Sequence, residues 1–180
     1  IDEPIFRGLQ PANPDIGAFQ MVDDGSSFAL VLAKDNEPLQ KIMNEGIRRY
    51  KKDGTLKKLD EIWFGSDDSL KKMPARKEGT KGTIICGTSA EYYPIGYIKD
   101  GEVVGYEPAL ATSILQEAGY NVKFQNMDFN ALIPSIVTHK IDVAMGCILV
   151  TDERKKSVFM TEPEYKDTLV MAVRMKNVGS

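Results

Sequence analysis

Residues 121–150, NVKFQNMDFNALIPSIVTHKIDVAMGCILV, decide the fold. The stretch begins with alternating apolar and polar residues, continues at helical spacing and ends in an apolar run, which predicts a strand, a helix and a strand. Two strands joined by a crossover helix run parallel. The alternation of predicted strands and helices extends to both sides of this stretch. Before it lie a predicted strand, TIICGTS at 83–89, and a predicted helix, EPALATSILQEAG at 107–119; after it lies a predicted strand, TLVMAVRM at 168–175. We therefore predict an α/β fold with a mostly parallel sheet and helices on both faces.

Residues 28–65 predict one further strand and two helices. FALVLAK at 28–34 is an apolar run that reads as a buried strand. Asn36 stands where a helix cap is expected, and Gly54 suits the left-handed end of that helix. A second amphipathic stretch then continues to Gly65. These elements bring the expected sheet to five strands on one core.

The chain divides into five segments by composition. Residues 1–27 are rich in turn residues and are expected to form loops, and residues 66–82 read as a polar linker. We expect 28–65 and 83–176 to form one lobe together, and 177–180 to be a tail. The sequence contains neither a recognisable membrane span nor a recognisable signal sequence. The chain is therefore expected to be cytoplasmic, or to come from a longer chain whose targeting signal was removed with the rest of it.

Composition excludes several classes of function. The 180 residues include 23 Lys and Arg against 26 Asp and Glu, for a net charge of −3, which disfavours a nucleic-acid partner. Cys86 and Cys147 lack the spacing of a zinc site or redox dithiol, and both are expected to be buried. His139 is the single histidine, and we expect it at the surface or at a helix end. We predict no cofactor, because neither a P-loop nor a GxGxxG motif occurs.

Two segments suit a small-ligand crevice. The loop SAEYYPIGY at 89–97 and the charged run TDERKK at 151–156 both follow predicted strands. Ligands of open α/β sheets lie outside the carboxyl ends of the strands. Arg154 has the two-pronged donor geometry that suits a carboxylate, although a surface charge is an equal alternative. Ordinary packing is likewise an equal alternative for the tyrosines, and no carboxylate stands in an apolar context that favours acid–base catalysis.

The motifs GTSAEYYPIGY, DGEVVGYEPALA, NMDFNALIPSIVTHKIDVAMG and TDERKKSVFMTEPEY give residues 82–175 a family resemblance. This part resembles the first lobe of type II periplasmic (extracellular) substrate-binding proteins, family 3, which serve ABC importers of polar amino acids. Residues 28–65 resemble the last segment of the same family. The resemblance implies a single lobe in circularly permuted order, either a slice of a tandem protein or a stand-alone relative. It also implies that 28–34 and 168–175 lie side by side as hinge crossings.

The resemblance also implies an amino-acid site. The implied ligand-binding residues are Tyr92 and Phe129 as aromatic walls, Arg154 on the α-carboxylate, Ser89 as a contact, and Asp2 on the α-ammonium from the second lobe. Two positions depart from the family pattern: Leu149 replaces a threonine and Cys147 replaces a glycine. Losing one polar partner costs a bound zwitterion about 1 to 3 kcal/mol.

We therefore expect a non-enzymatic binding module of an ABC importer. Its ligand is expected to be a polar amino acid such as a glutamine-like one. Its expected partners are an ABC permease and a second chain or neighbouring domain that closes the cleft. The resemblance implies an extracytoplasmic location, tethered to or fused with a permease. The alternative is a structural or interaction lobe that binds no amino acid, which Leu149 and Cys147 favour; an enzyme ranks third.

Overall fold

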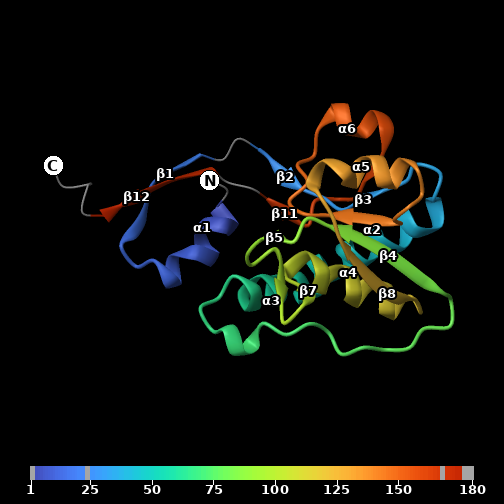
Figure 1. The fold of residues 1–180 in the computed structure, drawn as a ribbon, viewed down its shortest axis with the longest axis horizontal. Helices are drawn as coiled ribbons and strands as arrows, with labels where there is room; N and C mark the ends of the chain where they lie inside the picture. Colours follow the sequence, from blue (N-terminus) through green and yellow to red (C-terminus); the bar gives the residue numbers. More distant parts are fainter. Residues whose placement is uncertain (1–2, 23–24, 167–168, 176–180) are drawn as a thin grey trace.

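The computed structural model describes residues 3–22, 25–166 and 169–175, which form a lobe and a two-stranded ribbon that projects from it (Figure 1). The helices are α1 (Glu3–Leu9), α2 (Glu37–Asp53), α3 (Thr55–Trp63), α4 (Tyr106–Glu117), α5 (Phe129–Val137) and α6 (Asp152–Ser157), with 3₁₀ turns η1 (Gln10–Ala12) and η2 (Asp68–Leu70). The strands are β1 (Ile16–Val22), β2 (Ser27–Phe28), β3 (Val31–Leu32), β4 (Thr83–Thr88), β5 (Glu91–Tyr92), β6 (Gly96–Lys99), β7 (Glu102–Val104), β8 (Asn121–Asn126), β9 (Val143–Met145), β10 (Phe159–Met160), β11 (Tyr165–Lys166) and β12 (Leu169–Arg174).

The lobe is built on a five-stranded mixed sheet of order β10-β3-β9-β4-β8. β4 runs parallel to both β8 and β9, as the strand–helix–strand pattern predicts. β3 runs antiparallel to its neighbours β9 and β10. The predicted α/β fold with five strands is confirmed, and the strand from 28–65 lies in the same sheet as β4. The expectation of a mostly parallel sheet is wrong: the sheet is mixed, because β3 pairs antiparallel with both of its neighbours.

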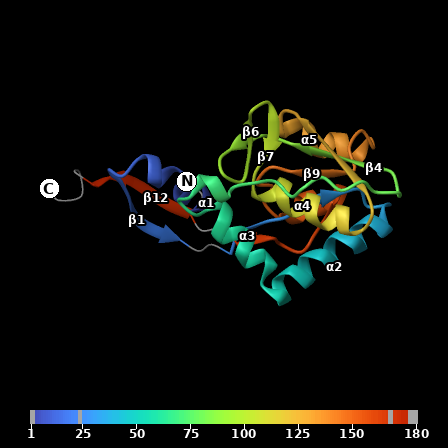
Figure 2. The same cartoon turned by 90° about the horizontal axis from the view of Figure 1, so that it is seen from below.

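Helices cover both faces of the sheet. On one face, α2 and α4 pack on Leu30 and Leu32, and on the other α5 packs on Val31. Adjacent residues of an extended strand point to opposite faces, so this short segment contributes to both cores. Figure 2 shows α2 and α4 on the face seen from below.

Helix α2 follows its sequence signals. The side chain of Asn36 accepts a hydrogen bond from the backbone N–H of Leu39. Gly54 follows the last residue of the helix with a left-handed φ of 84°. Gly46 faces α4 so closely that a Cβ built on it would lie 2.6 Å from Cγ2 of Ile114. Glycine lets the two helices approach here, which fixes α2 against the part of the lobe that follows residue 83.

The prediction that 168–175 pairs with 28–34 in the main sheet is wrong. β10, β11 and β12 pair in turn with β3, β2 and β1, so that Phe28 lies opposite Tyr165 and Leu169 opposite Val22. The chain from β10 to β12 thus runs antiparallel to the chain from β1 to β3, and this pairing continues from the main sheet into the projecting ribbon, where β12 lies. β10 occupies the position in the main sheet that we predicted for 168–175.

Two expectations of loop are also wrong. Residues 1–27 contain α1 and β1, and the predicted loop 89–97 contains β5 and the start of β6, which belong to the three-stranded sheet β5-β6-β7. The turn residues around 16–22 hid a strand whose partner, β12, lies near the other end of the chain. Strand pairing over such a distance leaves no local signal in the sequence.

The polar segment 66–82 runs over the surface with one 3₁₀ turn. The side chain of Asn121 bonds the N–H and C=O of Gly79, and that of Gln116 bonds Lys77 N–H and Ala75 C=O. The segment is thus held against the edge of the lobe formed by α4 and β8.

Candidate functional site

The carboxyl ends of β4 and β9 meet, because Thr88 lies opposite Met145 in the parallel ladder. Ser89 follows β4 and Gly146 follows β9. A Cβ built on Gly146 would lie 3.2 Å from the backbone nitrogen of Ser89, so the two segments touch. Ser89 is buried, and no hydrogen-bond partner for its Oγ is found in the described part of the chain. A buried hydroxyl with no partner is available to a ligand or a water molecule.

Arg154 is held by two groups of the lobe. Its Nη1 donates to the carbonyl of Leu149 at 2.7 Å, and its Cζ lies 5.7 Å from the ring centroid of Phe129. A guanidinium has five N–H donors, so this bond leaves donors for a carboxylate. Three of the predicted site residues are therefore brought together.

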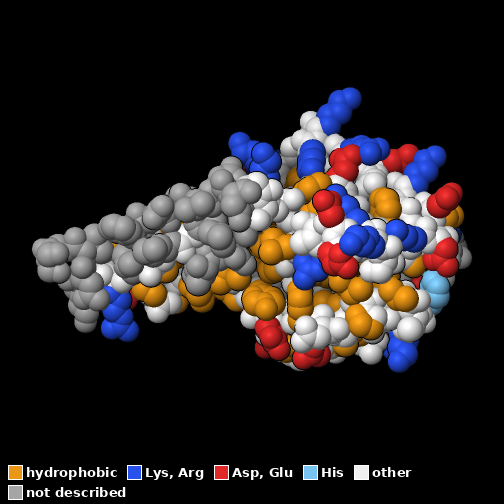
Figure 3. Space-filling view, turned by 90° about the horizontal axis from the view of Figure 1, so that it is seen from above, with side chains coloured by type: hydrophobic (Ala, Val, Ile, Leu, Met, Phe, Trp, Pro, Cys, Tyr) orange, Lys and Arg blue, Asp and Glu red, His pale blue; other side chains and the backbone are white. Residues whose placement is uncertain are grey.

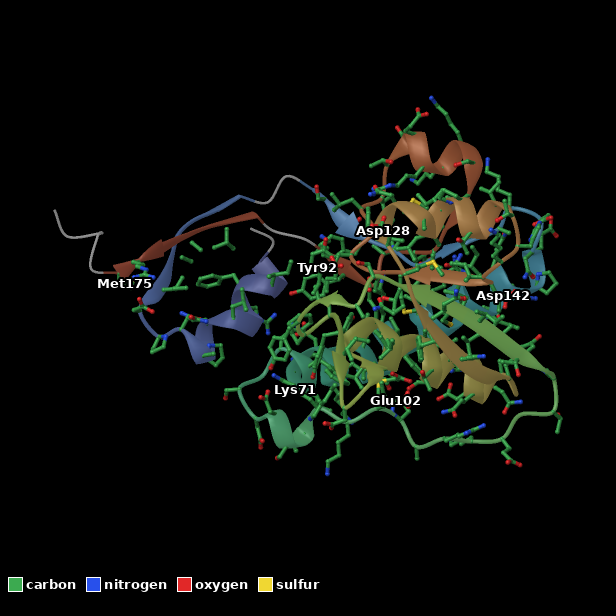
Figure 4. The ribbon with its side chains drawn as sticks, viewed as in Figure 1. Lys71, Tyr92, Glu102, Asp128, Asp142 and Met175 are labelled. Atoms are coloured by element: carbon green, nitrogen blue, oxygen red, sulfur yellow. The ribbon has the colours of Figure 1, made fainter. Side chains whose placement is uncertain are left out.

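Helix caps position these side chains. Asp128 caps α5 by accepting the N–H of Asn130, which places Phe129 in the first turn; Figure 4 labels Asp128. Thr151 caps α6 by accepting the N–H of Arg154. Asp and Thr are residue types that commonly cap helices, and each stands directly before the first residue of its helix.

Of the three tyrosines in 89–97, two take part in the packing of the lobe. The hydroxyl of Tyr93 bonds Lys71 and Asp68, and the ring of Tyr97 meets Trp63 edge-on at 6.4 Å. Tyr92 is half-buried in β5, on the side of the lobe from which the ribbon leaves (Figure 4). The ligand contact of Tyr92 stays a prediction.

Cys147 occupies an unusual backbone position. Its φ is 56°, in the left-handed region that glycine adopts without strain. Its N–H donates to both carboxylate oxygens of Glu107, at 3.1 and 3.3 Å. Cys86 is buried as predicted, whereas Cys147 is only half-buried.

The statement that no carboxylate stands in an apolar context is wrong for Glu107 and Glu164. Both are buried beside the aromatic cluster of Phe28, Phe64, Tyr106 and Tyr165. Burial raises the pKa of Glu107 to about 7, against the opposing backbone hydrogen bond from Cys147. Burial, followed by the charge of Glu107, raises the pKa of Glu164 well above its usual range. No pattern around either residue distinguishes it from an exposed glutamate.

The other residues singled out from the sequence lie as follows. Asp2 lies outside the described residues. Leu149 is 37% exposed, and its backbone pairs with Phe28 in an isolated bridge. His139 is exposed, as predicted, with Nε2 3.3 Å from Oδ2 of Asp35. The ligand-binding roles of all these residues stay predictions.

The surface offers other features besides this group of residues. Figure 3 shows hydrophobic side chains where the lobe meets the ribbon and along the lower part of the lobe in this view, with acidic and basic side chains among and around them. A cavity of about 990 Å³ lies elsewhere, between segment 72–79, β7 and β8. No helix in the described ranges is long and apolar enough to cross a bilayer.

The structure is an open α/β lobe with side chains gathered beyond the ends of two parallel strands, the place where proteins of this fold class bind small ligands. Residues 84–178 match the bacterial extracellular solute-binding proteins, family 3, and the chain belongs to this family. It is a family of binding proteins rather than enzymes.

Two curated relatives illustrate the match. The arginine-binding extracellular protein ArtP of Bacillus subtilis is 36% identical over 88 residues, which cover 49% of this chain and 34% of that protein. A probable histidine-binding protein of Campylobacter jejuni is 30% identical over 91 residues, which cover 51% and 36%. The chain spans about a third of the length of these relatives.

Solved structures give a similar picture. The arginine-bound form of domain 1 from TmArgBP is 32% identical and covers 55% of this chain and 85% of its own, with a TM-score of 0.46. An ancestral arginine-binding protein bound to arginine is 38% identical and covers 43% and 34%, with a TM-score of 0.41.

Proposed function

We propose that this lobe binds the carboxylate end of a polar amino acid for an ABC importer, and that a second lobe or chain completes the site. The observation that carries the proposal is the geometry of Arg154, oriented by the Leu149 carbonyl and the Phe129 ring. Charge-assisted, two-pronged bonds make arginine the preferred partner of a carboxylate. In this proposal Ser89 and Tyr92, which follow β4 in the chain, supply a polar and an aromatic contact.

A cationic ligand is favoured as the first to test. The relatives include proteins named for binding arginine and histidine, and the ancestral arginine-binding protein is also known bound to glutamine. Arginine and glutamine share the α-carboxylate and α-ammonium that the site has to recognise. A single lobe leaves one of these charges without a partner, which is costly, and the missing partner is expected from the second lobe.

We further propose that 28–65 and 83–176 are one first lobe in circularly permuted order, joined by 66–82. The position of β3 between β9 and β10 and the close approach of Gly46 to Ile114 support this. In this proposal 1–27 belongs to the hinge and second lobe, and the chain works outside the cytoplasmic membrane, tethered to or fused with a permease.

The test is isothermal titration with arginine, glutamine and histidine, using Arg154→Ala and the matched control Lys155→Ala. Lys155 is exposed on the same short helix. We expect Arg154→Ala to weaken binding about 10- to 150-fold, the loss of a hydrogen bond to a charged group, and Lys155→Ala to bind as the unmodified chain does. Equal losses in both variants, or no binding of any ligand at millimolar concentration, would contradict the proposal.

The second candidate is an interaction lobe that binds no amino acid. The exposed side chain of Leu149 favours it, because an apolar group stands beside the arginine where a polar contact is expected. Absence of binding together with a mass in solution of twice the chain mass would support this candidate.

A further inference from the structure

Glu107 and Glu164 form a buried pair beneath the turn that follows β9. Glu107 lies in the first turn of α4 and is 1% exposed, and Glu164 precedes β11 and is 4% exposed. Beyond its own backbone N–H and the carboxyl of Glu107, no group in the described part of the chain bonds the carboxyl of Glu164. No ion pair of either glutamate occurs there either, so two acids lie together with no cation bound to them.

One proton makes this arrangement stable. Two ionised carboxylates in a buried site repel each other, whereas a protonated carboxyl donates a hydrogen bond to its ionised neighbour. The ionised form is better stabilised at Glu107, because the N–H of Cys147 donates to both of its carboxylate oxygens. Glu164 receives no N–H from another residue of the described chain and takes the proton.

The surrounding groups do not neutralise the pair. From α4, Tyr106 donates its hydroxyl to the backbone carbonyl of Glu164, not to the carboxyl. From β11, the Tyr165 hydroxyl accepts from Arg7 of α1, which also faces Asp60 of α3. The cation of α2, Lys51, donates to the carbonyl of Pro163. Cys147 supplies a thiol from the turn itself.

Glu107 holds the turn on which the proposed site depends. Gly146 has a φ of 132° and Cys147 one of 56°, so the turn contains two consecutive residues in conformations that cost energy for ordinary residues. The bonds from Cys147 N–H to Glu107 fix this shape. Two residues further on, the carbonyl of Leu149 orients Arg154.

We propose that Glu107 is a positioning residue of the amino-acid site, acting as the ionised member of a pair in which Glu164 holds the single proton. This deepens the proposed function and rests on it. Adding a second proton weakens the hold of Glu107 on the turn, and removing the first one drives the carboxylates apart. Ligand affinity is therefore highest over the pH range in which the pair holds one proton.

The experiment has a ligand-free arm and a ligand arm, both on the whole chain. In the first, NMR follows the carboxyl carbons of the glutamates with pH and the hydrogen exchange of the Cys147 amide. We expect one buried carboxyl to stay protonated at neutral pH, and Glu107→Gln to speed exchange of the Cys147 amide. The exposed Glu102, labelled in Figure 4, provides the control Glu102→Gln, which should leave both signals in place.

In the second arm, arginine and glutamine are titrated at pH 5, 7 and 9. We expect Glu107→Gln to weaken binding about fivefold at pH 7, because a neutral acceptor replaces a charged one. Glu164→Gln, which imitates the protonated acid, should abolish the loss of affinity between pH 7 and pH 9. This variant also keeps the proposal testable if Glu107→Gln does not fold.

The two arms separate this inference from the proposed function. No binding by the unmodified chain overturns the proposed function, while the Cys147 amide and the glutamate carbons still report on the pair. Binding that Glu107→Gln leaves unchanged, with unchanged exchange at Cys147, overturns the positioning role alone. Two ionised carboxyls at neutral pH overturn the shared proton.

Discussion

Arg154 donates a hydrogen bond from Nη1 to the main-chain carbonyl of Leu149 at 2.7 Å. The contact uses the backbone of Leu149, so any side chain at this position allows it. The family resemblance implies a threonine at this position, so we expect the leucine to remove a hydroxyl and to leave the orientation of the arginine intact. In the proposed site this change weakens binding and does not abolish it.

Leu149→Thr is expected to tighten amino-acid binding about fivefold, because it adds a hydroxyl next to the arginine and keeps the carbonyl in place. Isothermal titration with arginine measures the change. Leu70→Thr, at a leucine that is exposed elsewhere, is the matched control and should bind as the unmodified chain does. Weaker binding in Leu149→Thr would show that the leucine side chain itself takes part in the site.

Phe129→Leu is expected to weaken binding about two- to fivefold, since it removes the ring beneath the guanidinium, an attraction worth about 0.5 to 1 kcal/mol at an exposed site. Phe124→Leu is the matched control, because Phe124 is also partly buried but packs on the opposite face of the sheet. Both variants should lose similar stability in urea, and only the first should lose affinity. Equal affinities would remove Phe129 from the proposed site.

Gly46→Ala is expected to lower the free energy of unfolding by about 1 kcal/mol, although alanine favours helices. The new Cβ would meet Ile114 at 2.6 Å, and overpacking of about 1 to 3 kcal/mol exceeds the gain in helix propensity. Urea unfolding measures the change.

The partner in this contact is tested by a double-mutant cycle. Ile114→Ala removes the atoms that the new methyl group meets, so the double variant should be more stable than the sum of the two single changes predicts. Additive effects would mean that α2 does not dock on α4, and the single permuted lobe would then be wrong.

Stability is expected to fall as pH rises from about 5 to about 7. Burial raises the pKa of Glu107 from 4.5 to about 7, so in this window the folded chain holds a proton that the unfolded chain has released. Glu164 adds to the fall, because burial raises its pKa as well. Urea unfolding at successive pH values measures this slope.

Glu164→Gln should flatten the slope, and Glu102→Gln should leave it unchanged. The exposed Asp53, Asp67 and Asp68 act in another window, since hydrogen bonds lower the pKa of each, and their stabilisation is lost only below pH 3.8. A slope that Glu164→Gln does not alter would show that other groups carry it.

Local signals predicted most of the helices and several strands. α2 begins after Asn36 and ends at Gly54 because capping and left-handed backbone are properties of a few neighbouring residues. Apolar periodicity likewise placed α4, α5 and the strand–helix–strand unit at 121–150. The residues around Arg154 were identified through family resemblance, and their contact with Phe129 needed the fold.

By itself, the sequence determined the alternation of strands and helices, and with it an α/β lobe. Only the tertiary structure decided that β12 pairs with β1 outside the main sheet, and that Glu107 and Glu164 are buried. The reason is physical: caps and periodicity act over a few residues, whereas strand pairing and burial depend on partners distant in the chain. The residues next to a glutamate in the sequence do not show which distant segment will bury it.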